Sequence, residues 1–200
     1  IENSNFLRER TPSQATLIQL QVGLLATAKE LQNDLRGIAA SANTRTPQGL
    51  QKILQETTLS LLRQPSLWVY ANLENGNVPF NAAESTFNRL SLTERSKLTA
   101  ELTSNYSGEI LSGNDSSRVQ PGEAGETNEY IAVTLLIASK SNLGMTSCTN
   151  SEQLQENLQK IGAISSTDLM ALEIIWQPEG SQEVLTAEDL VTAYPNLKHL

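Results

Sequence analysis

Few side chains in this sequence have the types needed for redox, metal or nucleophilic chemistry. The 200 residues contain one cysteine, Cys148, and one histidine, His199, which is next to the last residue. A single cysteine excludes an internal disulfide framework and a cysteine-based zinc site, and a single histidine excludes a multi-histidine metal site. Without a nearby histidine, the many Ser and Thr hydroxyls have no base to activate them. We therefore expect no catalytic, cofactor-binding or metal-binding residues.

Cys148 itself has two interpretations. It lies in a Thr-Ser-Cys-Thr-Asn loop before an expected helix, and a helix N-terminus can lower the pKa of a thiol. A redox sensor with one thiol would need a second chain to form a disulfide. An inert loop cysteine is the more common arrangement.

Glu173 is the carboxylate with the most interesting position. It lies in the middle of an apolar stretch, where Leu169, Ala171 and Ile175 share its face of an expected strand. A carboxylate on a buried face has to be paired or neutralised, and Arg63, at the end of its helix, is the expected partner. Three alternatives stay open: an edge strand with Glu173 facing water, a buried structural ion pair, or a carboxylate that handles protons.

Three aromatic residues are candidates for an interaction surface or a pocket. Trp68 and Tyr70 alternate on one face of a short strand, and Leu67 and Val69 occupy the other. Aromatics at this spacing usually pack in a core against a helix, whereas an exposed pair would form an interaction patch. Trp176 could stack on a ligand or could end its strand inside the core. With Arg63 and Glu173, these residues make up our candidate interaction or pocket set.

Hydrophobic periodicity predicts the elements that position these residues. Strands are expected at residues 17–24, 67–71, 130–138 and 169–176. Capping residues predict six helix starts, namely Thr27 with Glu30, Thr46 with Pro47, Asn81 with Glu84, Ser91 with Glu94, Asn150 or Ser151, and Thr186 with Asp189. Gly162 is expected to end the fifth of these helices in a left-handed conformation.

The order of elements predicts an α/β (α+β) fold. We expect a four-stranded sheet with helices mainly on one face, in a ferredoxin-like βαβ-βαβ arrangement with extra helices. Right-handed crossovers within each half would place the strands at 17–24 and 130–138 in the centre of the sheet. The stretch at 130–138 is apolar on both faces, as is typical of a strand that is covered on two sides.

Length and charge indicate one domain with two polar appendages. Residues 1–15 are expected to form a polar arm or linker, residues 16–200 the single domain, and residues 105–128 a mobile acidic loop with four acidic residues against one arginine. The net charge of −8 argues against a nucleic-acid binder. No stretch approaches the roughly 18 apolar residues of a membrane span. The chain begins with Ile1 rather than Met, so we expect a piece of a longer protein with an anchor upstream.

Five stretches of the chain resemble a known family. They are LQVGLLATAKELQNDLRGIA, TRTPQGLQKILQETTLSLLRQPSLWVYA, LSLTERSK, EYIAVTLLIAS and LMALEIIWQPEGSQEVLTAEDLVTAYPNLKHL. The family has no known function, occurs in cyanobacteria and plant chloroplasts, and includes the plant fluctuating-light acclimation protein. The residues that match its pattern are Gln55, Glu56, Arg63, Pro65, Trp68, Glu94, Arg95, Trp176, Pro178, Tyr194 and Pro195.

The resemblance implies a membrane-associated protein of the thylakoid, plasma or plastid membranes, linked to photoprotection and pH homeostasis. It implies no set of catalytic residues. Our first hypothesis is therefore a non-enzymatic regulatory or scaffold domain that acts through contacts with unidentified proteins. The alternative is a sensor of a small ligand or ion, with a pocket between the sheet and the helices. An enzyme is a third hypothesis.

Overall fold

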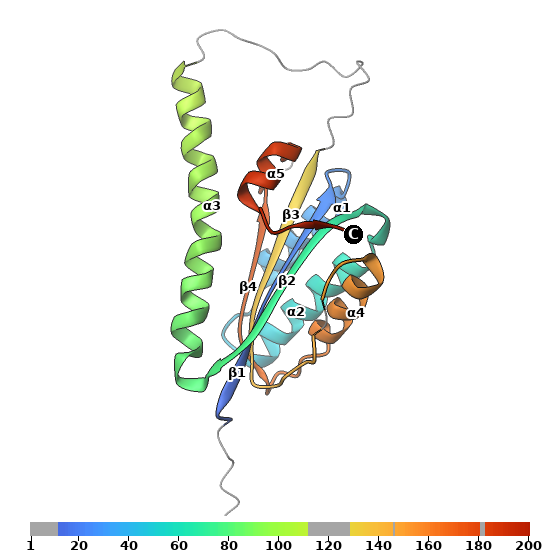
Figure 1. Ribbon diagram of the computed structural model, residues 1–200, viewed down its shortest axis with the longest axis vertical. Helices are drawn as coiled ribbons and strands as arrows, with labels where there is room; N and C mark the ends of the chain where they lie inside the picture. Colours follow the sequence, from blue (N-terminus) through green and yellow to red (C-terminus); the bar gives the residue numbers. More distant parts are fainter. Residues whose placement is uncertain (1–11, 112–128, 146, 181–182) are drawn as a thin grey trace, which may run out of the picture.

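The computed structural model describes residues 12–111, 129–145, 147–180 and 183–200, with side chains in the 83–111 helix described up to Lys97. These residues form one antiparallel sheet with the strand order β4-β3-β1-β2-β5, and helices on both of its faces (Figure 1). The strands are β1 (Gln14–Leu25), β2 (Trp68–Pro79), β3 (Tyr130–Ser139), β4 (Leu169–Gln177) and β5 (Lys198–His199). The helices are α1 (Lys29–Ser41), α2 (Pro47–Leu62), α3 (Ala83–Leu111), α4 (Ser151–Gly162) and α5 (Ala187–Ala193).

The α+β class is confirmed, but the details of the sheet differ from the prediction. The described sheet has five strands instead of four, because β5 pairs with the start of β2. β1 and β2 are antiparallel neighbours. The two helices between them bring the chain back to the end of the sheet at which β1 finishes, so β2 starts there and runs in the opposite direction. The expected ferredoxin-like pair of βαβ halves is not confirmed. β2 and β3 instead lie on either side of β1, and α3 connects them.

The central position of the two long strands is confirmed. β1 and β3 are neighbours, and each has a further strand on its other side. Every residue of β3 is buried, as expected for a strand with both faces covered. β4 is an edge strand of the described sheet, which matters below because it carries Glu173 and Trp176.

The two faces of the sheet are covered by different helices. Helices α1, α2 and α4 pack on one side, which we call the apolar face, and their leucines and isoleucines meet alternate residues of β1 and β3. Its fully buried members include Leu20, Leu24, Leu31, Leu35, Leu54, Leu135, Leu154 and Leu158. Helices α3 and α5 lie against the opposite side of the sheet (Figure 1). The prediction of helices mainly on one face therefore holds for three of the five described α-helices.

Three of the six predicted helix starts are confirmed; of the others, Asn81 lies in the 3-10 turn Phe80–Ala82 that leads into α3 instead of capping that helix. Thr46 caps α2 by accepting a hydrogen bond from the Gly49 N–H, Asn150 caps α4, and Thr186 with Asp189 forms a capping box on α5. Thr27 caps nothing, because α1 begins at Lys29 without a side-chain cap. Ser91 does not start a helix either. It lies within the continuous helix α3, where both it and Glu94 are buried facing the sheet.

The boundaries of the two expected appendages change. Strand β1 begins at Gln14 and Ala15 is buried, so the strand takes in the end of the expected arm at 1–15. Residues 1–11 lie outside the described part of the chain. Helix α3 extends to Leu111, so residues 105–111 of the expected loop are helical, and residues 112–128 lie outside the description.

Gly162 has a role other than the predicted one. Helix α4 is followed by Ala163 in a right-handed conformation, with φ −88° and ψ −1°. Gly162 instead allows α4 to approach α2 closely. A Cβ atom at this position would lie 2.7 Å from Thr58 Oγ1 of α2, which is shorter than a van der Waals contact.

Candidate functional site

A cleft lies at the free edge of β4, between that strand and helices α1 and α2. We call it the β4 cleft; its volume is about 340 Å³. Most of its lining is aliphatic, and its polar members are Thr44, Thr57, Arg95 and Glu173, together with the indole of Trp176. The structure thus brings two of the five candidate residues, Glu173 and Trp176, to one site.

Glu173 has an ion-pair partner that the sequence reasoning did not identify. Its side chain is 14% exposed, and its carboxylate accepts a hydrogen bond from Nε of Arg95 on α3. The predicted partner, Arg63, is exposed at the end of α2 and does not line the cleft. Two of the open alternatives therefore combine: β4 is an edge strand, and Glu173 is nonetheless mostly buried and paired.

Two polar atoms of residues that line the β4 cleft are themselves buried, and they have no hydrogen-bond partner among the described residues. They are the indole N–H of Trp176 and the hydroxyl of Thr57, whose side chain is completely buried. Two described residues of the same types are satisfied. Trp68 donates its indole N–H to Leu61 O at 3.1 Å, and Thr58 donates its hydroxyl to Leu54 O at 3.0 Å. Leaving a buried polar group without a partner costs about 1–3 kcal/mol, so each of these two atoms carries a cost of this size.

The other two candidate aromatics do not form an exposed patch. Trp68 is 7% exposed and belongs to the core on the apolar face, as the commoner of its two interpretations predicts. Tyr70 is half-buried and makes edge-to-face contacts with Tyr130 and His199, at ring distances of 5.6 and 5.4 Å. The alternative of an exposed Trp68–Tyr70 pair is therefore wrong. The predicted shared face is wrong as well, because an irregularity in the pairing of β1 with β2 places the two aromatic rings in the cores on opposite faces of the sheet.

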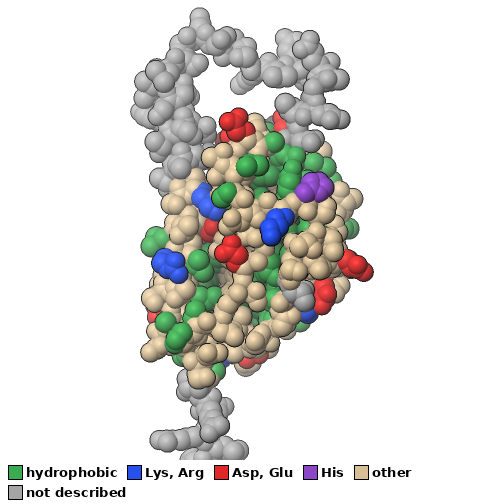
Figure 2. Space-filling view, in the orientation of Figure 1, with side chains coloured by type: hydrophobic (Ala, Val, Ile, Leu, Met, Phe, Trp, Pro, Cys, Tyr) green, Lys and Arg blue, Asp and Glu red, His purple; other side chains and the backbone are tan. Residues whose placement is uncertain are grey.

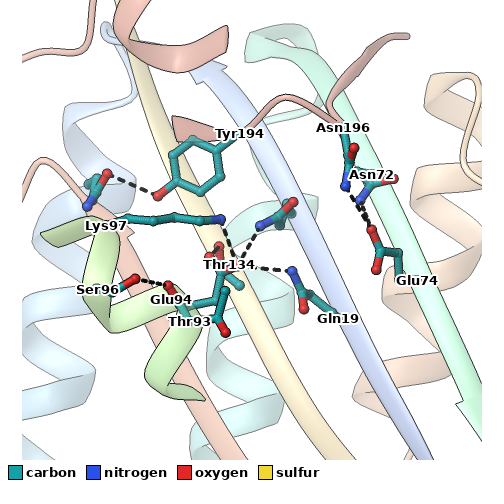
Figure 3. A network of polar contacts seen from close by, with 12 residues as sticks. Gln19, Asn72, Glu74, Thr93, Glu94, Ser96, Lys97, Thr134, Tyr194 and Asn196 are labelled. Carbon is teal, nitrogen blue, oxygen red and sulfur yellow. Dashed lines mark hydrogen bonds and ion pairs between the residues drawn. The ribbon is translucent and has the colours of Figure 1, made fainter. Parts of the chain in front are cut away.

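A buried polar cluster between α3 and the sheet went unrecognised in the sequence. Glu94 of α3 is 2% exposed, and its Oε1 accepts hydrogen bonds from Gln19 at 3.1 Å, Gln21 at 3.2 Å and Lys97 at 2.7 Å (Figure 3). Thr134 of β3 lies 3.5 Å from the other oxygen. We call these five residues the polar seam. The available signal was the pair Gln19 and Gln21, which put two amides on the same face of a central strand.

Lys97 extends this cluster towards α5. Its ammonium lies 4.4 Å from the centre of the Tyr194 ring, and the Tyr194 hydroxyl donates to Gln177 Oε1 of β4 at 3.1 Å (Figure 3). Such a cation–π contact is worth about 0.5–2 kcal/mol, depending on desolvation. One lysine therefore contacts both a carboxylate of its own helix and an aromatic residue that follows α5.

Cys148 and the charged residues offer no further site in the described part of the chain. Burial raises the pKa of the Cys148 thiol above its ordinary value, and a hydrogen bond with Asn157 lowers it only in part. This shift is opposite to the one that would activate the thiol. The described residues contain no group of three or more His, Cys, Asp or Glu that could hold a metal ion. Within the same residues, no helix combines the length and hydrophobicity needed to cross a bilayer.

The outer surface over α3 and α5 is chemically mixed. In Figure 2, side chains of both charges lie among hydrophobic ones on this face of the molecule. Among the residues whose side chains are described, the exposed large hydrophobic ones are Leu59 on α2, Leu92 on α3 and Val191 on α5. Since they lie on three different helices, they do not by themselves define an interaction patch.

Comparisons with known proteins identify related sequences. A family described as "Protein of unknown function (DUF1517)" matches residues 14–200. Protein FLAP1 homolog A of Synechocystis sp. is 41% identical over 98% of this chain and 60% of its own length. FLUCTUATING-LIGHT-ACCLIMATION protein 1, chloroplastic, of Arabidopsis thaliana is 33% identical over 98% of this chain and 52% of its own length. The chain thus spans little more than half of these relatives, and no solved structure matches it.

Proposed function

Because this chain belongs to the DUF1517 family of proteins of unknown function, we propose a regulatory, non-enzymatic role in the acclimation of a photosynthetic organism to changing light. The name of the Arabidopsis relative and the cyanobacterial origin of the other support this role. By the same resemblance, the domain works at a photosynthetic membrane, in photoprotection or pH homeostasis.

The β4 cleft favours a sensor of a small ligand over a domain that acts through protein contacts. A pocket lined by Trp176 and Glu173 is what a sensor of a small ligand requires, and the cleft has both residues, with Arg95 instead of Arg63. Pockets of about 300–1,000 Å³ are typical of small-molecule sites. The domain therefore acts by binding a small molecule in this cleft.

Regulation through protein contacts is the second candidate. The surface expected for it does not form, because Trp68 is buried in the core and Tyr70 is half-buried. Leu92 on α3 keeps this candidate open, because 68% of it is exposed on a helix that packs on the sheet through other residues. Replacing Leu92 with Gln would reduce capture of such a partner without affecting a ligand in the cleft.

A complementation experiment tests the proposed role. In a Synechocystis strain that lacks its FLAP1 homolog A, the matching part of that protein is replaced by this chain, and quenching of chlorophyll fluorescence is followed under fluctuating light. Ala39→Phe on α1 places an aromatic ring in the cleft, whereas Ala40→Phe places the same ring at the next residue, which does not line the cleft. We expect the unmodified chain and Ala40→Phe to restore quenching, and Ala39→Phe to fail.

The outcomes separate the role from its mechanism. Failure of the unmodified chain would count against the acclimation role of this domain. Full restoration by Ala39→Phe would leave the role intact and exclude the cleft as its mechanism.

A further inference from the structure

We propose that the chain forms a symmetric dimer in which the β4 strands of two copies pair edge to edge and antiparallel to each other. The two sheets then form one continuous sheet, and the β4 cleft of each copy lies next to the junction. This arrangement goes beyond the proposed function, which requires one copy only.

The outer edge of β4 is available for a further strand. Within the described residues, β4 pairs with β3 on one side and with no strand on the other. Residues 170–174 of β4 are half-buried, whereas every residue of β3 is buried. An edge strand presents unpaired backbone N–H and C=O groups on its outer side, and these groups are a template for pairing with another chain.

Most of the features that keep edge strands from associating are missing from β4. The strand contains no lysine, arginine or proline, and its one charged side chain, Glu173, is paired with Arg95. Its pairing with β3 is regular from Ala171 to Gln177, so this stretch contains no bulge. Native proteins protect free edges with charges, proline or bulges. An apolar edge without this protection is expected to be covered by a partner.

The opposite edge of the described sheet is protected. Strand β5 pairs only with Tyr70 and Ala71 of β2, which leaves the rest of β2 as an edge. The exposed residues of this part of β2 are polar or unsuited to a strand, namely Glu74, Asn75, Gly76, Asn77 and Pro79. Of the two edges, one is therefore suited to association. Assembly through that edge closes at two copies and does not continue into a fibre.

A second copy of the chain fits this edge because the pairing is self-complementary. The pairings within the sheet are all antiparallel. A two-fold axis perpendicular to the sheet places β4 antiparallel to its own copy, which continues this pattern. The same axis keeps like faces together, so Leu172, Ile174 and Trp176, which pack on the core of the apolar face, meet apolar residues of the second copy. One apolar strand thereby supplies both halves of the interface.

Glu173 selects the register of this pairing. An axis through Glu173 would place two carboxylates directly opposite each other, and like charges in that position are destabilising. An axis through Leu172 instead sets Glu173 opposite Ala171 of the second copy, whose small side chain leaves room for the ion pair with Arg95. Leu172 then faces its own copy. Because Leu172 lines the β4 cleft, the second copy adds a side chain to the border of the cleft.

The mass of the chain in solution tests the dimer. Light scattering after size-exclusion chromatography should give twice 21.8 kDa for the unmodified chain at high concentration. Leu172→Lys places two ammonium groups at the axis and should weaken the dimer at least about tenfold, which corresponds to about 1.4 kcal/mol. Asn75→Lys is the matched control on the edge at β2 and should leave the dimer intact. Circular dichroism establishes that both variants are folded.

Hydrogen exchange of the unmodified chain tests the interface without a substitution. Amide exchange in β4 should slow as the protein concentration rises, with no change in residues 72–79 of β2. A chain that keeps a mass of 21.8 kDa at every concentration would overturn the dimer. A dimer with unchanged exchange in β4, or with full affinity in folded Leu172→Lys, would overturn the assigned interface. Assemblies larger than two copies would overturn the closed arrangement.

These results are distinguishable from a failure of the proposed function. A monomeric chain leaves the acclimation role and the cleft of a single copy untouched, and Ala39→Phe in the complementation experiment tests these separately. Conversely, a dimer through β4 stands even if Ala39→Phe restores quenching in full.

Discussion

The two faces of the sheet pack against their helices through different kinds of side chain. On the apolar face, Leu20 of β1 and Leu135 of β3 are completely buried against Leu54 and other aliphatic side chains of the covering helices. On the opposite face, Glu94 of α3 meets the amides of Gln19 and Gln21, and a lysine closes the group. The same two central strands thus supply hydrocarbon to one layer of helices and hydrogen-bond donors to the other.

The two faces contribute differently to the stability of the fold and to the position of α3 on the sheet. Burial of apolar surface is non-directional and supplies most of the free energy of folding. Hydrogen bonds to a buried carboxylate contribute less net free energy, but they are lost unless donor and acceptor are correctly placed. We therefore expect the apolar face to hold the fold together, and the polar seam to fix where α3 lies on the sheet.

The largest effect should follow from a cavity in the apolar face. Leu54→Ala removes a completely buried side chain from α2 and should lower the free energy of unfolding by about 2–5 kcal/mol. Leu59→Ala, on the exposed side of the same helix, is the matched control and should change it by less than about 0.5 kcal/mol. Urea unfolding followed by circular dichroism measures both. Equal losses in the two variants would refute the view that this face carries the stability.

The polar seam should respond in a more local way. Glu94→Ala leaves the amides of Gln19 and Gln21 and the ammonium of Lys97 without their shared acceptor, and should cost about 2 kcal/mol. Hydrogen exchange should accelerate in α3 and stay slow in β1. Arg89→Ala, an exposed change on the same helix, should affect neither quantity. Equal acceleration in β1 would show that the seam supports the whole sheet.

A smaller effect should follow from closing the space between α2 and α4. Gly162→Ala places a Cβ atom 2.7 Å from Thr58 Oγ1, and the forced displacement should cost about 1–2 kcal/mol. Gly37→Ala on α1, where a Cβ atom meets nothing within 4 Å, should instead stabilise the fold by up to about 1 kcal/mol. Thermal unfolding of the pair gives the comparison. A gain in both variants would mean that the approach of the two helices is not tight.

The smallest effect should be a pH dependence of the free energy of unfolding that comes from Cys148 in the core of the apolar face. Cys148 is 5% exposed within that core, and burial raises the pKa of its thiol in the folded chain. Above about pH 8.5 the unfolded thiol loses its proton first, so the unfolded state is favoured as the pH rises. The contribution of Cys148 to stability should therefore fall with pH, by about 1.4 kcal/mol per pH unit at most. Subtracting the unfolding curve of Cys148→Ala isolates it, and a contribution that grows with pH would contradict the direction of the shift.

The parts of the fold that could be predicted were those set by local pattern. The period-two alternation in β1, the apolar run of β3 and the side-chain caps of α2, α4 and α5 all act within a few residues, and all three kinds of signal were confirmed. Strand direction could not be obtained in the same way. Whether β2 runs with or against β1 depends on the path of the chain through α1 and α2, which leaves no mark on either strand.

The candidate site was only half predictable for a similar reason. Glu173 and Trp176 stand out because a carboxylate and an indole interrupt an apolar strand, so the sequence alone indicates them. Arg95 could not be assigned as the partner of Glu173, because the approach of α3 to the edge of β4 is a tertiary contact. The role of Glu94 was missed because a Ser-x-x-Glu pattern also predicts a helix start, and here it is buried in mid-helix instead.

The position of β1 between β2 and β3 has a consequence for biosynthesis. Leu20 pairs with Leu73 on one side and with Leu135 on the other, so the second partner leaves the ribosome about 60 residues after the first. At about 5–20 residues per second, β1 would have one unpaired hydrogen-bonding edge for several seconds. An open edge on so apolar a strand is a template for pairing with another chain. Newly made chains are therefore expected to need protection during this interval, until β3 is inserted beside β1.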